Sequence, residues 1–291
     1  MLFKRFFFGI VVLLLAASPA FSASSEPFAQ GLLWKISKAG VKPSYAFGTI
    51  HLDDARVTNL PAPVKRAFAG SASFTMEMII DEDSTQKFLG AMLLPESDLQ
   101  TLLGEPLFTD TAGLLAEYGM PQEVITTFKP WAVMLTLMLP QRQGIIVDSV
   151  LHELALRQKK NVYQLENVDE QIAVFDGLPL EVQIGLLRQT VTHHDLIPDM
   201  VEESLHAYLK RDLAAMWDIN NRIIENDAVQ SFNDAFIERV LYQRNARMVE
   251  RMQPRLQEGN AFFAMGALHL YGKKGVLSLL KARGYSITRV Y

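Results

Sequence analysis

Strand-like segments lie near both ends of this chain, and most of the sequence between them has helical periodicity. Residues 32–37 and 43–50 are apolar runs separated by a short polar turn, which predicts a β-hairpin. Residues 72–79 predict a buried strand, and residues 260–270 and 285–291 predict two more at the carboxyl end. Such strands must share a sheet to bury their faces. The pattern therefore predicts an α/β fold, with one central mixed sheet formed from both chain ends and a large helical middle.

The middle of the chain contains the signals expected of helices joined to a sheet. Residues 97–108 predict a helix with Ser97 as its N-cap, and residues 148–160 predict another that opens on Asp148 as a cap. The second of these leads directly into residues 161–167, which read as a short strand. A helix followed at once by a strand is the unit expected of an α/β sheet.

The first 22 residues have the three parts of a secretory signal. A basic start is followed by an apolar run of about a dozen residues and then by small residues up to Ser22. The alternative is an uncleaved membrane anchor, but the run is shorter than the roughly 20 residues that a spanning helix needs. We expect cleavage after Ser22, which leaves residues 23–291 as a single domain with no stable membrane span.

Charge and cysteine content narrow the function further. Cleavage would remove Lys4 and Arg5, which leaves 28 − 2 = 26 basic against 32 acidic residues and a net charge of −6. An acidic chain without a basic block is a poor binder of nucleic acid. The chain has no cysteine, which rules out disulfides, thiolate metal sites and a cysteine nucleophile. An exported protein without disulfides indicates a periplasmic or secreted location.

One motif occurs twice, once near each end of the chain. "YAFGTIHL" contains Gly48 and His51, and "FFAMGALHL" contains Gly266 and His269, each after an apolar strand-like run. A glycine at this place frees the backbone to turn sharply and allows a neighbour to approach closely. The two motifs are either independent strand ends or two parts of one site.

Two glutamates stand at the ends of two further predicted strands. Glu77 sits in "FTMEM", near the carboxyl end of one strand, and Glu166 ends "VYQLE". In open, mostly parallel sheets the ligand crevice lies outside the carboxyl ends of the strands, so the four side chains would converge there. Two imidazoles and two carboxylates suit a divalent ion such as zinc, manganese, cobalt or iron. One glutamate could instead act as the general base on a metal-bound water.

Each of these residues also has a structural interpretation. A histidine after a strand is usually a satisfied turn or core residue, and Glu166 could simply cap a strand end. Glu77 lies in an apolar strand and must find a partner there, and a structural ion pair with an arginine would explain it as well as a functional site would. Arg244 and Asn245 lie on a predicted long helix, where surface solvation is the default. The remaining histidines fall on or between helices, namely His152, His193, His194 and His206.

The sequence resembles the TraB/GumN family, which is related to the TIKI metalloproteases. Segments that carry the resemblance include "SYAFGTIHL", "FTMEM", "KPWAV", "QRNARM" and "FFAMGALHLYGKKG". It runs over nearly the whole mature chain, from Leu32 to Val290. The chain departs from the family at Ile146-Val147-Asp148, where a Gly-Leu-Asp segment is usual.

The resemblance implies a fold and a set of site residues. The two chain ends would meet in one sheet, and His51 and His269 would match the family's motif histidines. Glu77 would match its first acidic position and Glu166 its Leu-Glu glutamate. A late Arg-Asn pair in the family would match Arg244 and Asn245.

Together these features predict an exported metal-dependent hydrolase that acts on a peptide or amide bond. His51, His269 and one or both of Glu77 and Glu166 would hold the ion, and the other glutamate would activate water. Arg244 or Asn245 would stabilise the developing oxyanion. Two alternatives remain open: a non-catalytic protein that binds iron, haem or another small ligand, and an accessory factor in envelope or polysaccharide assembly. A peptide, a protein or a small molecule would be the partner, and nucleic acid would not.

Overall fold

The computed structural model describes residues 26–140, 144–221 and 234–291. The predicted signal segment and its cleavage position lie outside these residues. Two chain stretches of the middle, 141–143 and 222–233, lie outside them as well.

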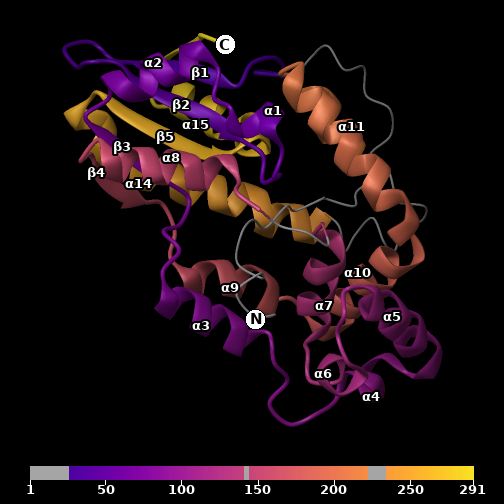
Figure 1. Ribbon diagram of the computed structural model, residues 1–291. Helices are drawn as coiled ribbons and strands as arrows, with labels where there is room; N and C mark the ends of the chain where they lie inside the picture. Colours follow the sequence, from indigo (N-terminus) through magenta and orange to yellow (C-terminus); the bar gives the residue numbers. More distant parts are fainter. Residues whose placement is uncertain (1–25, 141–143, 222–233) are drawn as a thin grey trace.

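A mixed six-stranded sheet forms the centre of the upper half of the molecule (Figure 1). Its strand order is β4-β3-β5-β2-β1-β6. The four adjacent strands β4, β3, β5 and β2 run parallel to one another, whereas β1 pairs antiparallel with both β2 and β6. The bounds are Leu33–Ser37 for β1, Ser44–Thr49 for β2, Ser73–Met76 for β3, Asn161–Gln164 for β4, Ala261–Gly266 for β5 and Ser286–Arg289 for β6. The predicted α/β fold with a sheet shared by both chain ends is therefore confirmed.

The strands from the two ends of the chain are direct neighbours. β2 pairs with β5 in a parallel register that sets Gly48 opposite Met265 and Thr49 opposite Gly266. The two strands end level with each other, and the two Gly-x-x-His segments leave the sheet side by side. β3 lies on the other side of β5, so a third strand end joins them.

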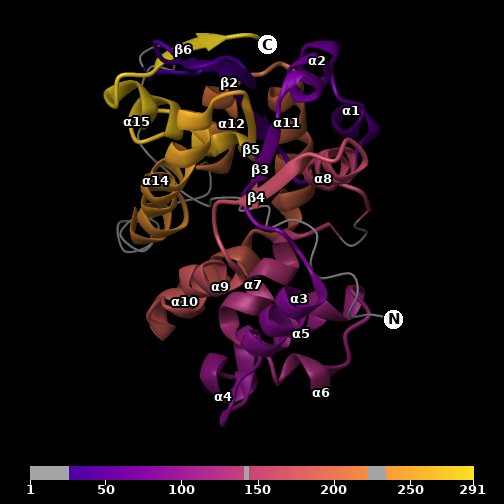
Figure 2. The ribbon, with the colours of Figure 1, turned by 90° about the vertical axis from the view of Figure 1, so that its left-hand side faces the viewer.

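Helices cover both faces of the sheet (Figure 2). One face carries α1, α2 and α8, and the other carries α12, α14 and α15. These helices span Ala55–Thr58, Ala62–Gly70, Val147–Arg157, Leu213–Asn220, Gln243–Glu258 and Val276–Ala282. Large aromatic side chains fill the space between sheet and helices, where Phe68 of α2 packs edge-on against Phe74 and Phe262. Their burial contributes about 1.5–3 kcal/mol each to the free energy of unfolding.

A second, helical layer lies beyond the carboxyl ends of β3 and β4 (Figure 1). Its helices are α3 (Glu82–Ala91), α4 (Leu99–Leu103), α5 (Glu105–Glu117), α6 (Gln122–Ile125), α7 (Pro130–Met138), α9 (Val168–Asp176) and α10 (Leu180–Thr192). Every residue of α7 is buried, and Trp131 stacks on Phe175 at its centre. The long helix α11 (Ile197–Leu209) connects this layer back to the sheet. In the described part of the chain, none of the helices has the length and apolar character needed to span a membrane.

Two predicted helix caps are wrong. Asp98, not Ser97, caps α4 by accepting a hydrogen bond from the Thr101 N–H at 2.7 Å. The predicted single helix is also two, because Gly104 adopts φ +72° and separates α4 from α5. Asp148 does not cap α8, since Ile146 holds that position and Asp148 lies in the first turn.

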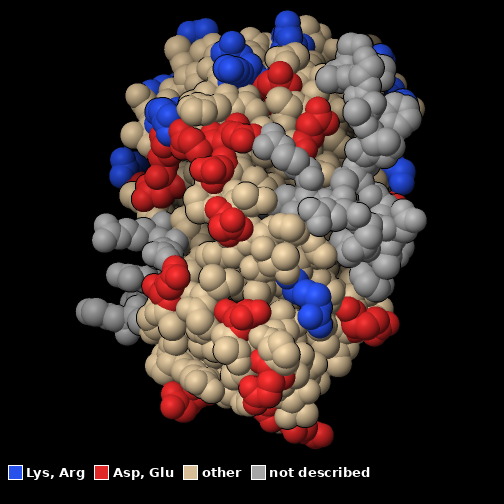
Figure 3. Space-filling view, turned by 90° about the vertical axis from the view of Figure 1, so that its right-hand side faces the viewer, with Lys and Arg blue, Asp and Glu red and all other residues tan. Residues whose placement is uncertain are grey.

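Acidic side chains are spread over much of one face of the molecule, while basic ones gather mainly near its top (Figure 3). This agrees with the formal net charge of −4 for the full chain.

Candidate functional site

Three of the four predicted metal ligands meet at one cavity beyond the carboxyl ends of the parallel strands. His51 follows β2, Glu77 follows β3 and His269 follows β5, and all three line a cavity of about 190 Å³. The parallel direction of β2, β3 and β5 brings them together, because it places all three strand ends at the same edge. Glu166 follows β4 but does not line the cavity.

Glu77 lies at the centre of the polar cluster. Its Oε1 accepts a hydrogen bond from the Gly266 N–H at 2.6 Å, and its Oε2 lies 2.6 Å from Arg244 Nη2. Burial alone would raise the pKa of Glu77, but the charges of Arg244, His269 and His51 together with the Gly266 bond lower it to about 2. Glu77 is therefore a fixed negative charge at neutral pH.

His269 is held in one tautomer by its surroundings. Asn245 Nδ2 donates to the Lys274 carbonyl at 3.0 Å, which orients the amide so that its Oδ1 faces His269 Nδ1 at 2.5 Å. This assignment places the proton on Nδ1 and leaves the lone pair on Nε2, 3.7 Å from Glu77 Oε1. Burial lowers the pKa of His269 to about 4, against the opposing charge of Glu77. The imidazole is neutral at pH 7.

His51 has a carboxylate partner that the sequence interpretation missed. Its Nε2 lies 3.3 Å from Oδ2 of Asp148, and Asp148 Oδ1 accepts a hydrogen bond from the Thr49 hydroxyl at 3.0 Å. Asp148 lies in the first turn of α8, where the partial positive charge of the helix end favours a carboxylate. Acidic residues are common in the first turn of a helix, so the local sequence does not distinguish Asp148 from them. Its pairing with His51 is revealed only by the three-dimensional structure.

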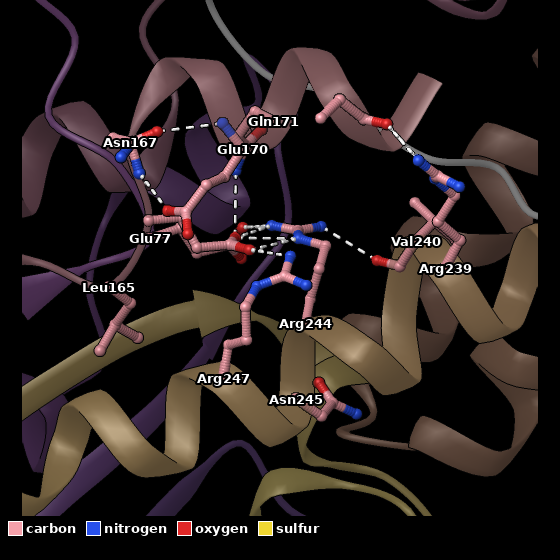
Figure 4. A network of polar contacts seen from close by, with 12 residues as sticks. Glu77, Leu165, Asn167, Glu170, Gln171, Arg239, Val240, Arg244, Asn245 and Arg247 are labelled. Atoms are coloured by element: carbon pink, nitrogen blue, oxygen red, sulfur yellow. Dashed lines mark hydrogen bonds and ion pairs between the residues drawn. The ribbon is translucent and has the colours of Figure 1, made fainter. Parts of the chain in front are cut away.

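Glu166 pairs with two arginines of α14, Arg244 and Arg247, whose side chains Figure 4 shows close together. Its side chain is fully buried, and its oxygens lie 2.7 Å from Arg244 Nη2 and 3.2 Å from Arg247 Nη2. Gln171 Nε2 donates to the same carboxylate at 3.3 Å. Glu166 thus contacts Arg244 through both Nε and Nη2, and it shares the Nη2 group with Glu77.

Arg244 joins the two predicted glutamates through a single guanidinium. It is nearly completely buried, and it still lines the cavity. Arg244 and Asn245 begin α14, directly after one π-helical turn, η3 (Glu238–Tyr242). Such turns often occur at functional sites because they shift the side chains that follow. The surface interpretation of this pair is wrong, since both side chains are buried at the site.

The two motif glycines differ in their packing. A Cβ on Gly48 would lie 2.9 Å from the Ala267 Cα, a contact that real Cβ atoms essentially never make. A Cβ on Gly266 would meet Glu77 Oε1 at 3.4 Å and His269 Cδ2 at 3.5 Å, which is ordinary van der Waals contact. The close approach of the Ala267 backbone therefore explains the glycine at position 48, whereas no such contact explains the glycine at position 266.

The other histidines take no part in this cavity. His206 is exposed on α11 and pairs with Glu202 at 3.2 Å. His193 and His194 mark the end of α10, and the Tyr118 hydroxyl lies 3.4 Å from His194 Nε2. As predicted, His206 lies within a helix, and His193 and His194 lie between the helices α10 and α11.

The donor types at the cavity suit a divalent ion. Two imidazoles and a carboxylate are common ligands, and His269 already has the neutral form and the hydrogen-bonded Nδ1–H of a metal-binding histidine. Within the described ranges, however, no group of three or more histidine, aspartate or glutamate side chains is placed so that it could hold an ion. Metal binding by His51, His269, Glu77 and Glu166 therefore stays a prediction.

Sequence comparison identifies metalloproteases among the similar proteins. Metalloprotease TIKI2 of Danio rerio is 27% identical over 90% of this chain and 61% of its own length, and metalloprotease TIKI1 of Danio rerio is 27% identical over 88% and 62%. The chain thus covers about three-fifths of these relatives. The uncharacterized protein YbaP of Escherichia coli (strain K12) is 23% identical over 84% of this chain and 90% of its own length. No solved structure matches the chain significantly.

A family model covers almost the entire described fold. It matches residues 32–289, from the residue before β1 to the last residue of β6. Both Gly-x-x-His segments, both glutamates and the Arg-Asn pair fall inside this match. The chain belongs to the TraB/PrgY/gumN family.

Proposed function

We propose that this protein is an exported metal-dependent hydrolase that cleaves a peptide or amide bond. The observation that carries the proposal is the meeting of His51, Glu77 and His269 at one cavity, with the guanidinium of Arg244 in its wall. Relatives at 27% identity are named metalloproteases, which favours this chemistry over simple ligand binding. Export is inferred from the signal-like first 22 residues.

In this proposal His51, His269 and Glu77 hold the ion. The ion would polarise the carbonyl of the substrate and acidify a water molecule. Asn245 keeps the Nδ1 proton of His269 in place, so that its Nε2 lone pair stays available. Glu166 has a positioning role, because it fixes Arg244 and lies outside the cavity wall.

Arg244 and Asp148 have separate roles in the reaction. The Arg244 guanidinium would stabilise negative charge that develops on the carbonyl oxygen. A carboxylate with a pKa of about 2, such as Glu77, is a weak base. Asp148 also lines the cavity, its Oδ2 lies 3.3 Å from His51 Nε2, and in this proposal that oxygen would accept the proton of the attacking water.

Metal analysis and peptidase assays on purified protein test the proposal. Wild type should retain a divalent ion after dialysis and should hydrolyse peptides from a mixed library, as detected by mass spectrometry. His51→Ala and His269→Ala should lose both properties. His206→Ala, a substitution on the exposed side of α11, should keep both. Equal metal content and equal hydrolysis in all four proteins would contradict the proposal, and metal retention without hydrolysis would indicate a binding protein instead.

A further inference from the structure

The cavity extends from the polar cluster into an apolar chamber. Its polar end is formed at the sheet edge, whereas the opposite wall comes from the helical layer and from η3. That wall includes the large apolar side chains of Phe88, Leu135, Leu139, Val240 and Leu241. The whole cavity, polar end included, has a volume of about 190 Å³, which is of the same order as the roughly 150 Å³ of an apolar cavity that accepts benzene.

Methionines form much of the remaining lining. Met76 and Met78 flank Glu77, and Met92 and Met216 enter from α3's end and from α12. Methionine is unbranched and polarisable, so such a wall adapts to differently shaped apolar groups. Near Glu77 the chamber is therefore both apolar and adaptable.

The polar groups in the helical part of the wall offer little to a polar ligand. The Thr136 hydroxyl donates to the Ala132 carbonyl at 2.8 Å, and Asn220 Nδ2 donates to the Met216 carbonyl at 2.6 Å. Ser204 is different. It is 4% exposed, and its hydroxyl has no hydrogen-bond partner among the described residues. An unpaired buried hydroxyl costs about 1–3 kcal/mol, which a bound ligand with one polar atom would offset.

We propose that the substrate carries a large apolar side chain, of leucine or phenylalanine size, beside the bond placed at the polar cluster. The apolar chamber seats this side chain, and Ser204 can bond a backbone polar atom of the same ligand. The inference rests on the proposed function for the position of the reacting bond. The seat itself is a property of the chamber wall and can be tested without turnover.

Methyl NMR of methionine-labelled protein provides the test. The probes are N-acetyl amino acid amides of glycine, alanine, valine, leucine and phenylalanine, added with EDTA so that no metal is needed. The leucine and phenylalanine amides should shift the chamber methyls and bind at least about tenfold more tightly than the glycine amide. The chamber methyls belong to Met76, Met78, Met92 and Met216, and the buried methyls of Met120 and Met252 serve as internal controls.

A pair of variants on α11 sharpens the test. Ser204→Leu places an apolar group inside the chamber, and it should weaken binding of the phenylalanine amide at least about fivefold. His206→Leu adds the same group on the exposed side of the helix and should leave binding unchanged. If Ser204→Leu does not fold, Val201→Phe fills the same wall.

Each outcome has a definite meaning. Equal binding across the amide series, no chamber shift up to the solubility limit, or unaltered binding in the filled variant would overturn the chamber proposal. Size-dependent binding supports it even if no metal or hydrolysis is found, and in that case only the hydrolase proposal fails.

Discussion

The Nδ1 atom of His269 lies 2.5 Å from Oδ1 of Asn245, and this contact determines the chemical state of the imidazole. Because the amide is itself held by the Lys274 carbonyl, His269 must donate through Nδ1 and keep Nε2 unprotonated. Asn245 thus determines that the His269 nitrogen facing Glu77, Nε2, carries a lone pair and no proton.

The first prediction concerns the titration of His269. Its pKa of about 4 lies below the usual 6.5, so between these values the unfolded chain binds a proton that the folded chain does not. Stability from this group is complete above pH 6.5 and is lost as the pH falls towards 4, by up to roughly 3 kcal/mol. Urea unfolding of wild type and His269→Gln between pH 4 and 7 checks this. The variant should show a shallower fall, and parallel curves would contradict the prediction.

The second prediction concerns Arg244, whose guanidinium pairs with the buried Glu166 and the partly buried Glu77. Arg244→Met leaves Glu77 and Glu166 without their shared guanidinium and should cost about 3–5 kcal/mol of unfolding free energy. Arg283→Met removes an exposed pair with Glu250 and should leave the free energy of unfolding nearly unchanged. Urea unfolding at pH 7 measures both values, and similar losses would show that Arg244 is not a central contact.

The third prediction separates the two motif glycines. Gly48→Ala forces a Cβ against the Ala267 backbone and should destabilise the protein by about 1–3 kcal/mol. Gly266→Ala meets only side-chain atoms at ordinary distances and should change the unfolding free energy by less than about 1 kcal/mol. Thermal or urea unfolding compares them directly. An equal loss of unfolding free energy at both positions would show that position 266 also requires a glycine.

The fourth prediction concerns Asp148. Asp148→Asn keeps an acceptor for the Thr49 hydroxyl but removes the charge beside His51. If Asp148 accepts the proton of water, turnover should fall by about 10²–10⁴ with little change in stability. Asp98→Asn, which preserves an N-cap far from the cavity, is the matched control and should keep full turnover. Unchanged turnover in Asp148→Asn would remove it from the mechanism.

Periodicity and strand patterning were sufficient to predict the sheet and the convergence of three of the four strand-end side chains. The apolar runs at both ends form β1, β2, β5 and β6, and the residues that follow β2, β3 and β5 meet as expected. This worked because the carboxyl ends of parallel strands share an edge, so position along each strand already determines which side chains converge.

The partners of these residues could not be read from the sequence. Asp148 has the same local signature as a helix cap, and only its distance to His51 reveals the contact. Arg244 lies on a strongly amphipathic helix, and the π-helical turn before it changes which side chains face inward. The ion pairs of Glu77 and Glu166 join residues 167 and 78 positions apart, beyond the reach of any local pattern.

The strand order also limits how this chain can be assembled. β5 lies between β3 and β2, and the Ala261 N–H bonds to the Ser44 hydroxyl across 217 positions of sequence. A polypeptide truncated before β5 would therefore not form a smaller version of the sheet. It would contain two separate strand pairs, β1–β2 and β3–β4, each with an open edge. The full sheet cannot form until β5, which begins at Ala261, is present. Folding should therefore be slow and dominated by pairing between strands far apart in the sequence. Fragments released during synthesis would be prone to pair edge to edge with one another.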